Sequence, residues 1–177
     1  MGWARDVLGF WFAQPPARWW NGGEAFDEEV RKGFRPVWDE QRARLPEELL
    51  EAPDHALAAI LLFDQFPRNM FRGHADQFAT DPLALAVAKG AVERGYDDGM
   101  PAERRLFLYM PFQHSEDPKD QTRSLLLFAA LGDPEPLRFA RLHHDIIARF
   151  GRFPHRNAML GRKPRAEEVA AGDVVPW

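Results

Sequence analysis

The chain has 177 residues, 45% of them hydrophobic, and a formal net charge of −4 at pH 7. This length fits one domain with a sizeable core, and the weak acidity argues against nucleic-acid binding, which needs a broad basic surface. The chain has no cysteine, which excludes disulfides, thiolate catalysis and cysteine-ligated zinc and is consistent with a reducing compartment. No apolar run has the length of a signal peptide or of a membrane span. We therefore expect a cytoplasmic protein without a membrane partner.

The first predicted helix carries one apolar stripe, formed by Trp3, Val7 and Trp11, with Leu8 and Phe12 beside it. Gln14-Pro15-Pro16 ends it. Trp19 and Trp20 then fall in a predicted loop. An aromatic pair at this place is typical of a lid over the core rather than of a ligand platform.

Two longer helices follow. One is predicted over residues 24–45, with a kink or split at Pro36. The next opens with Asp54 as its N-cap, and residues 56–63 are apolar all round, which indicates a buried helix. We expect it to stop at Phe66-Pro67, because a proline disfavours the α conformation in the residue before it.

An Asp-Pro pair occurs three times in the second half of the chain, as Asp81-Pro82, Asp117-Pro118 and Asp133-Pro134. In each pair we expect the aspartate to cap a helix whose first turn holds the proline. Another helix is predicted between Pro101 and Pro111. Gly132 closes the helix before Asp133, and so short a connection makes the two helices antiparallel. No segment alternates like a strand, so the predicted fold is all-α, built from antiparallel helix hairpins.

The last long helix ends at a basic corner. Gly151 suits a left-handed C-cap, and Phe153-Pro154 prevents the helix from continuing. Residues 146–166 hold six Lys or Arg and no Asp or Glu. A short helix is predicted over 165–171, and Trp177 is expected to pin the C-terminal tail.

Three blocks of the chain resemble an uncharacterised bacterial family, domain of unknown function 924. They begin at Asp64, Tyr109 and Phe150, and read DQFPRN, YMPFQHSED and FGRFPHRN. The opening segment VLGFWF, from Val7, is also similar. The resemblance implies a single domain with an all-helical fold of the tetratricopeptide-like superfamily. It implies no reaction, and it nominates residues without assigning their roles.

The two Phe-Pro segments echo each other, since each is followed by an Arg-Asn pair. If they meet in space, one pocket contains Arg68, Asn69, His155, Arg156 and Asn157. Two of its arginines can clamp a phosphate or carboxylate. Nearby candidates for the same ligand site are Asp64, Arg152 and His143. The alternative is structural: asparagines cap helices, arginines cover carbonyls, and Asp64 is the counter-ion of an arginine.

A second candidate set is His114 with Glu116. A histidine beside a carboxylate can act in general acid–base catalysis or bind a metal. The alternative is a polar loop that bonds its own backbone. Ser115 is a poor nucleophile candidate, because neighbours in sequence rarely face each other productively.

The pair His144-Asp145 invites comparison with helical metal phosphohydrolases. A dipeptide is a weak signal and no ligand series surrounds it, so we expect no metal site. The sequence also lacks a phosphate-binding glycine loop and a dinucleotide fingerprint, and we expect no cofactor.

Three functions fit these observations. The first is binding of a small anionic ligand or an acidic peptide terminus at the Arg/His/Asn pocket. The second is a hydrolase that uses His114 and Glu116, with or without a metal. The third is a protein–protein adaptor, which rests on fold analogy alone. We favour the first. The oligomeric state does not follow from the sequence.

Overall fold

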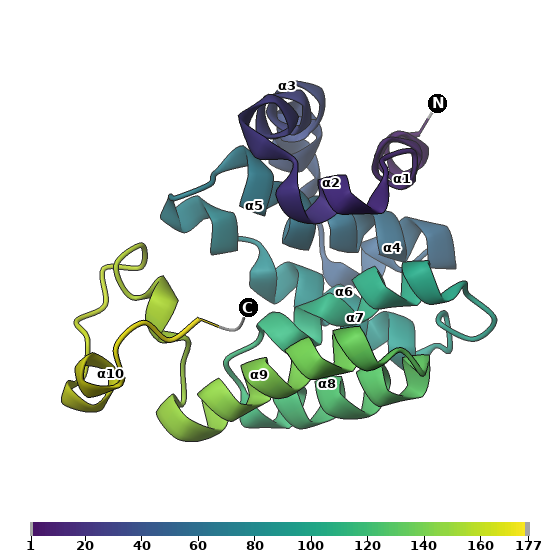
Figure 1. The fold of residues 1–177 in the computed structure, drawn as a ribbon. Coiled ribbons are helices and arrows are strands. Elements are labelled where there is room, and N and C mark those ends of the chain that lie inside the picture. Colours follow the sequence, from purple (N-terminus) through teal and green to yellow (C-terminus); the bar gives the residue numbers. More distant parts are fainter. Residues whose placement is uncertain (1, 176–177) are drawn as a thin grey trace. The chain divides into compact units, whose positions relative to one another are not determined.

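In the computed structural model, residues 2–175 are described, and none of them lies in a β-strand. The prediction of an all-α fold is confirmed. The α-helices shown in Figure 1 are, in chain order, α1 (Trp3–Phe12), α2 (Pro16–Asn21), α3 (Gly23–Gln41), α4 (Pro53–Ile60), α5 (Phe66–Met70), α6 (Asp81–Glu93), α7 (Ala102–His114), α8 (Pro118–Leu131), α9 (Pro134–Phe150) and α10 (Ala166–Ala171). A π-helical turn spans Leu61–Gln65, and 3₁₀ turns span Pro46–Leu49, Ala75–Phe78 and Pro154–Arg156.

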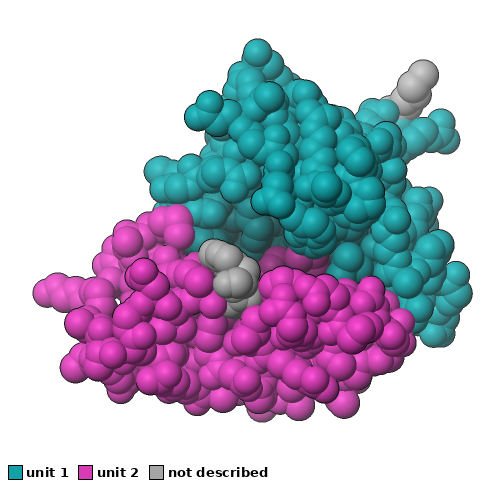
Figure 2. Space-filling view, viewed as in Figure 1, with its two compact units in different colours: residues 1–108 teal, residues 109–177 magenta. Residues whose placement is uncertain are grey.

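The chain forms two compact units, residues 1–108 and residues 109–177, coloured separately in Figure 2. The division falls within α7. The first unit has an aromatic core in which the ring of Trp11 lies 5.5 Å from those of Phe66 and Phe107, measured between centroids. Aromatic rings bury much apolar surface at favourable edge and tilted geometries, so this cluster is the main apolar centre around which α1 packs on α4.

The segment expected to be a loop after α1 is instead helix α2. Trp19 is half-buried and packs as expected of a lid over the core: its indole nitrogen donates to the carbonyl of Trp11 at 2.9 Å, and its ring meets Phe107 edge-on at 5.1 Å. Trp20 is 52% exposed and only stacks on Phe107. The prolines misled the prediction, because a proline in the first turn of a helix costs nothing.

Two further helix boundaries differ from the predictions. Helix α3 continues through Pro36 without a split and ends at Gln41, so Leu45, the predicted last residue, lies outside the helix and is 64% exposed. Helix α4 begins at Pro53 after an Ala52 cap. The predicted cap residue, Asp54, lies in the first turn, where its carboxylate accepts from Arg104 at 2.7 Å.

The predicted helix stop at Phe66-Pro67 is wrong, because the π-helical turn lets the chain continue into α5. Pro67 has no N–H to offer the carbonyl of Phe63, four residues earlier. The hydroxyl of Thr80 donates to that carbonyl at 2.7 Å and accepts from the indole nitrogen of Trp38 at 3.1 Å. A side chain 17 residues away thus satisfies the group that a proline leaves open.

Proline also misled the assignment of α6 and α7. Thr80 occupies the cap position of α6, and the predicted cap Asp81 lies in the first turn. Pro111 lies inside α7, which extends to His114. His114 is therefore at the end of a helix rather than in a loop.

The second unit is built on the hairpin of α8 and α9, which lie side by side in Figure 1. The predicted caps are confirmed: Asp117 accepts from the amide of Lys119 at 2.8 Å, and Asp133 from that of Glu135 at 3.0 Å. Gly132 has a positive φ of 76°, so the connection turns as predicted. The end of α9 packs its apolar residues together with Phe153, Ala171 and Val174. The predicted anchor Trp177 lies outside the described residues.

Candidate functional site

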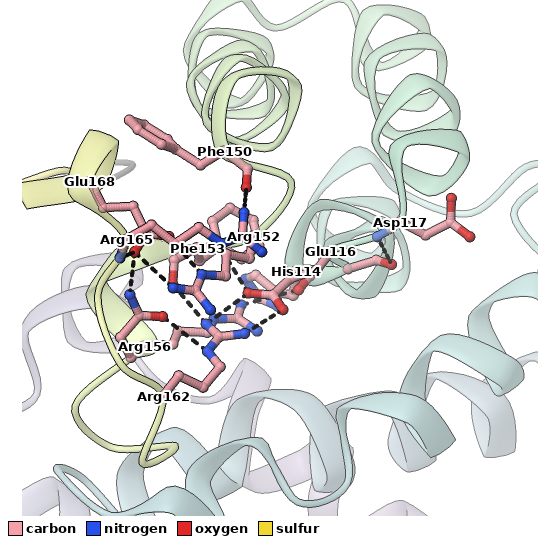
Figure 3. Close-up of polar contacts among 12 residues, drawn as sticks. His114, Glu116, Asp117, Phe150, Arg152, Phe153, Arg156, Arg162, Arg165 and Glu168 are labelled. Carbon is pink, nitrogen blue, oxygen red and sulfur yellow. Dashed lines mark hydrogen bonds and ion pairs between the residues drawn. The ribbon is translucent and has the colours of Figure 1, made fainter. Parts of the chain in front are cut away.

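The basic corner at the end of α9 forms as predicted. Gly151 adopts φ 67°, and its amide donates to the carbonyl of Ile147 at 2.8 Å. Pro154 then opens a 3₁₀ turn. The chain reverses here, and residues 152–168 fold back over the corner, as Figure 3 shows.

Phe153 is the centre of the corner. Its ring is fully buried, and the rings of His143 and His155 lie 5.5 and 5.6 Å from it, centroid to centroid. The guanidinium carbon of Arg156 lies 4.5 Å from the Phe153 centroid, within the range of cation–π attraction. Arg156 also donates to the carbonyl of His114 at 3.1 Å. We call His114, His143, His155 and Arg156 the histidine–arginine cluster.

The histidine rings are close enough to influence each other. His114 and His143 have centroids 6.1 Å apart. Nδ1 of His143 lies 2.8 Å from the carbonyl of Phe139. A carbonyl only accepts, so Nδ1 carries the proton and Nε2 is the acceptor of the neutral ring.

Burial and neighbouring positive charge keep two of these imidazoles neutral. Burial, together with the charges of His114 and Arg156, lowers the pKa of His143 to about 3, against the opposing effect of its hydrogen bond to Phe139. Burial and the charge of Arg156 lower the pKa of His155 to about 4, although Glu116 acts in the opposite direction. Burial is the larger cause for both rings, and the charge of Arg156 adds to it, so the corner disfavours further positive charge.

Glu116 is held by the fold rather than exposed as a reactive group. Its carboxylate accepts from the amide of Phe153 at 2.7 Å and from both terminal nitrogens of Arg162 at 2.7 and 3.1 Å (Figure 3). Arg162 also donates to the carbonyl of Phe153 and to Asn157. Burial raises the pKa of Glu116, but the hydrogen bonds from Arg162 and Phe153 outweigh it and lower the pKa.

A second carboxylate, that of Glu168, binds several donors of residues 152–168, which we call the returning segment. It is 3% exposed and accepts from Arg152 at 2.6 and 2.8 Å, from Asn157 at 3.0 Å and from the amide of Arg165 at 2.7 Å. The hydrogen bond from Arg152 is the main reason why the pKa of Glu168 falls to about 2. Arg152 and Asn157, both candidate ligand residues, thus have structural partners.

Ser115 also has structural partners. Its hydroxyl donates to Asp120 at 2.8 Å and accepts from the amide of Asp117 at 3.1 Å. This matches the alternative of a polar loop that bonds its own backbone.

The candidates in the first unit form their own network. Arg68 donates to both oxygens of Asp81 at 3.0 and 3.1 Å and to the carbonyl of Asp64, whose carboxylate lies 3.5 Å away. Asn69 donates to the buried Asp27 at 2.8 Å. The role of Asp64 as counter-ion to an arginine matches the structural alternative. A pocket shared by these residues and the histidine–arginine cluster stays a prediction.

A pocket of about 230 Å³ lies beside the cluster in the second unit. His155 and Asn157 belong to its wall, and the remainder is largely apolar, with Pro154, Pro164, Val169, Val174 and Val175. The pocket therefore places apolar side chains from residues 154–175 next to the imidazole of His155.

Within residues 2–175, there is no group of three or more His, Cys, Asp or Glu side chains arranged to hold a metal ion. The pair His144 and Asp145 is hydrogen-bonded at 3.1 Å on a solvent-facing part of α9. No helix in this part of the chain is both long enough and apolar enough to cross a bilayer.

Sequence reasoning missed Arg162 and Glu168. One signal for Glu168 was available: it is the third residue of α10, and it accepts from the amide of the N-cap Arg165, as in half of a capping box. No local pattern indicates the partner of Arg162, because that contact joins positions 46 residues apart.

The fold and the site define an all-helical protein whose second unit carries a histidine–arginine cluster where α9 ends. The chain belongs to the family of bacterial proteins of unknown function DUF924, which it matches over residues 7–171. It is similar to the solved structure of a protein of unknown function from Agrobacterium tumefaciens, with 42% identity, a TM-score of 0.89 and coverage of 95% of each chain. No curated protein matches its sequence. The tetratricopeptide-like classification stays a prediction.

Proposed function

We propose that the second unit binds a small anionic ligand, a phosphate or a carboxylate, at the histidine–arginine cluster. The observation that carries the proposal is the meeting of the imidazoles of His143 and His155 and the guanidinium of Arg156 around the buried ring of Phe153, with the ring of His114 next to that of His143. His143 gives its N–H to the carbonyl of Phe139, so the donors proposed for the ligand are those of Arg156 and of the His155 ring, whose positions the fold fixes. Preorganised donors reduce the entropy lost on binding.

Arg156 is the proposed ligand residue because its guanidinium lies on the Phe153 ring, which His143 and His155 also contact. Arg152 and Arg162 are each paired with a carboxylate, at 2.6 and 2.7 Å, and serve to hold the returning segment. The charge of Arg156 lowers the pKa of both His143 and His155. This contribution of the Arg156 charge, unlike that of burial, favours an anion at the same place.

The proposal predicts that binding is linked to protonation. A bound anion favours the charged form of a neighbouring imidazole, so it raises the pKa of His155 from about 4. At a pH between the pKa of His155 in the free protein and its pKa in the complex, binding of the anion is accompanied by uptake of a proton. The affinity for an anion therefore increases as the pH falls through this range, as long as the protein stays folded.

The direct test is titration of the full chain with phosphate and with acetate, followed through the histidine ring signals in NMR. We expect the signals of His114 and His155 to shift and to saturate. The variant Arg156→Ala removes a charged donor, and we expect about 10-fold weaker binding or more. The matched control is Arg141→Ala on the exposed side of α9, which leaves the affinity unchanged. Equal affinities of both variants, or no saturable shift, contradict the proposal.

The hydrolase alternative depends on His114 more than on Glu116. A carboxylate with three hydrogen bonds and a lowered pKa is a weak general base. Phosphatase and esterase assays of His114→Ala against the unchanged chain test this alternative. An adaptor role and a cytoplasmic location stay predictions, which pull-down and cell fractionation address.

A further inference from the structure

The pocket beside His155 indicates which kind of anion the cluster would bind. Its volume of about 230 Å³ is below the roughly 300–1,000 Å³ of pockets that hold drug-sized ligands. Val174 in its wall packs on the apolar end of α9, which fixes one side of the pocket. A molecule that fills this space is small and at least partly apolar.

The charges in the wall restrict the ligand further. Glu168 lines the pocket, but Arg152 and the amide of Arg165 neutralise its carboxylate. Asp173, the other acidic residue of the wall, is exposed to solvent. A ligand with a second negative charge away from His155 would lie near Asp173 and be repelled. The wall, whose charged side chains are Glu168 and Asp173, therefore disfavours a second negative charge on the ligand.

We propose that the ligand of this site is a small monocarboxylic acid. Its carboxylate lies beside His155 in the field of Arg156, and its apolar body occupies the pocket between Pro154, Val169 and Val174. This inference rests on the proposed function, to which it adds the class of ligand. A phosphate monoester, which carries close to two negative charges at pH 7, binds less tightly than such an acid.

The experiment compares acetate, butyrate and hexanoate on the full chain by calorimetry or NMR. Each buried methylene is expected to increase the affinity about three- to fourfold until the pocket is full. Val169 is 68% exposed, so Val169→Asn, which adds a polar group without charge, is expected to fold normally and to remove this dependence on chain length while acetate binding persists. Leu126→Asn, at an exposed site outside the pocket wall, is the matched control and keeps the dependence. Asp173→Asn is expected to increase the affinity for glutarate several-fold.

The outcomes separate the two proposals. If acetate and hexanoate bind equally well, the apolar body has no place in the pocket and this inference fails, while anion binding stands. If hexanol binds as tightly as hexanoate, the ligand is not an acid and the inference also fails. If no anion binds, the proposed function fails and this inference with it.

Discussion

At the scale of single residues, the ion pair of Glu116 and Arg162 joins the turn before α8 to the segment after α9. Arg162 donates to a carboxylate, a carbonyl and an amide oxygen. We expect Arg162→Ala to lower the free energy of unfolding by about 1–3 kcal/mol, less than for a fully buried pair because both side chains are partly exposed. Urea unfolding measures this loss. The control Arg138→Ala removes an exposed pair on α9 and should cost clearly less, because solvent screens that pair. Equal losses for both variants would show that the pair of Glu116 and Arg162 is not structural.

His143 makes stability depend on pH. Its pKa is about 3 in the folded chain and 6.5 in its unperturbed form. The unfolded chain therefore binds more protons between these values, so stability is full above pH 6.5 and declines as the pH falls towards 3. The loss is about 1.4 kcal/mol per pH unit for one such group. His143→Phe, which keeps a ring of similar size, should reduce this slope in urea unfolding at several pH values; an unchanged slope would contradict the assignment.

The sequence indicated which residues gather in the corner but not how they pair. His155, Arg156 and Asn157 follow the Phe-Pro segment, so their proximity could be predicted from the chain alone. Their partners could not, because Arg152 and Asn157 bind Glu168 only after the chain has turned back. A charge run shows that counter-charges are required, whereas tertiary contacts decide which carboxylate supplies them.

At the scale of the elements, the predicted caps Asp117, Asp133 and Gly151 are confirmed, and each acts through groups within a few residues. The predicted caps Asp54 and Asp81 are wrong, because both lie in the first turn of a helix. The prolines were also misread. Pro36, Pro67 and Pro111 all lie inside helices that continue. Whether a helix tolerates a proline depends on what satisfies the open carbonyl, which can be a residue far along the chain.

Thr80 is such a residue, and it gives a prediction for the π-helical turn. Thr80→Val keeps the shape of the side chain but leaves the buried carbonyl of Phe63 and the indole N–H of Trp38 without this partner. We expect a loss of about 2 kcal/mol or more in the free energy of unfolding, since each buried unsatisfied group costs about 1–3 kcal/mol. Thr122→Val on the exposed side of α8 is the matched control and should be nearly neutral. If the two variants are equally stable, Thr80 does not support the turn.

At the scale of the whole molecule, apolar periodicity and the lack of alternating segments predicted the all-α fold. The two compact units were not apparent, because their division lies within the predicted apolar helix that becomes α7. The proposed meeting of the two Phe-Pro segments stays a prediction. One of its premises changed: the first segment continues a helix, whereas the second ends one.

The central claim is that the histidine–arginine cluster binds an anion. The most direct measurement is the pKa of His155, determined by NMR with and without a saturating concentration of butyrate. We predict a value of about 4 in the free protein and a clearly higher value in the complex. At the same butyrate concentration the increase is smaller in Arg156→Ala, because that variant binds more weakly. The account is contradicted if butyrate leaves the pKa of His155 unchanged. That result would mean that butyrate binds elsewhere on the protein or does not bind at all.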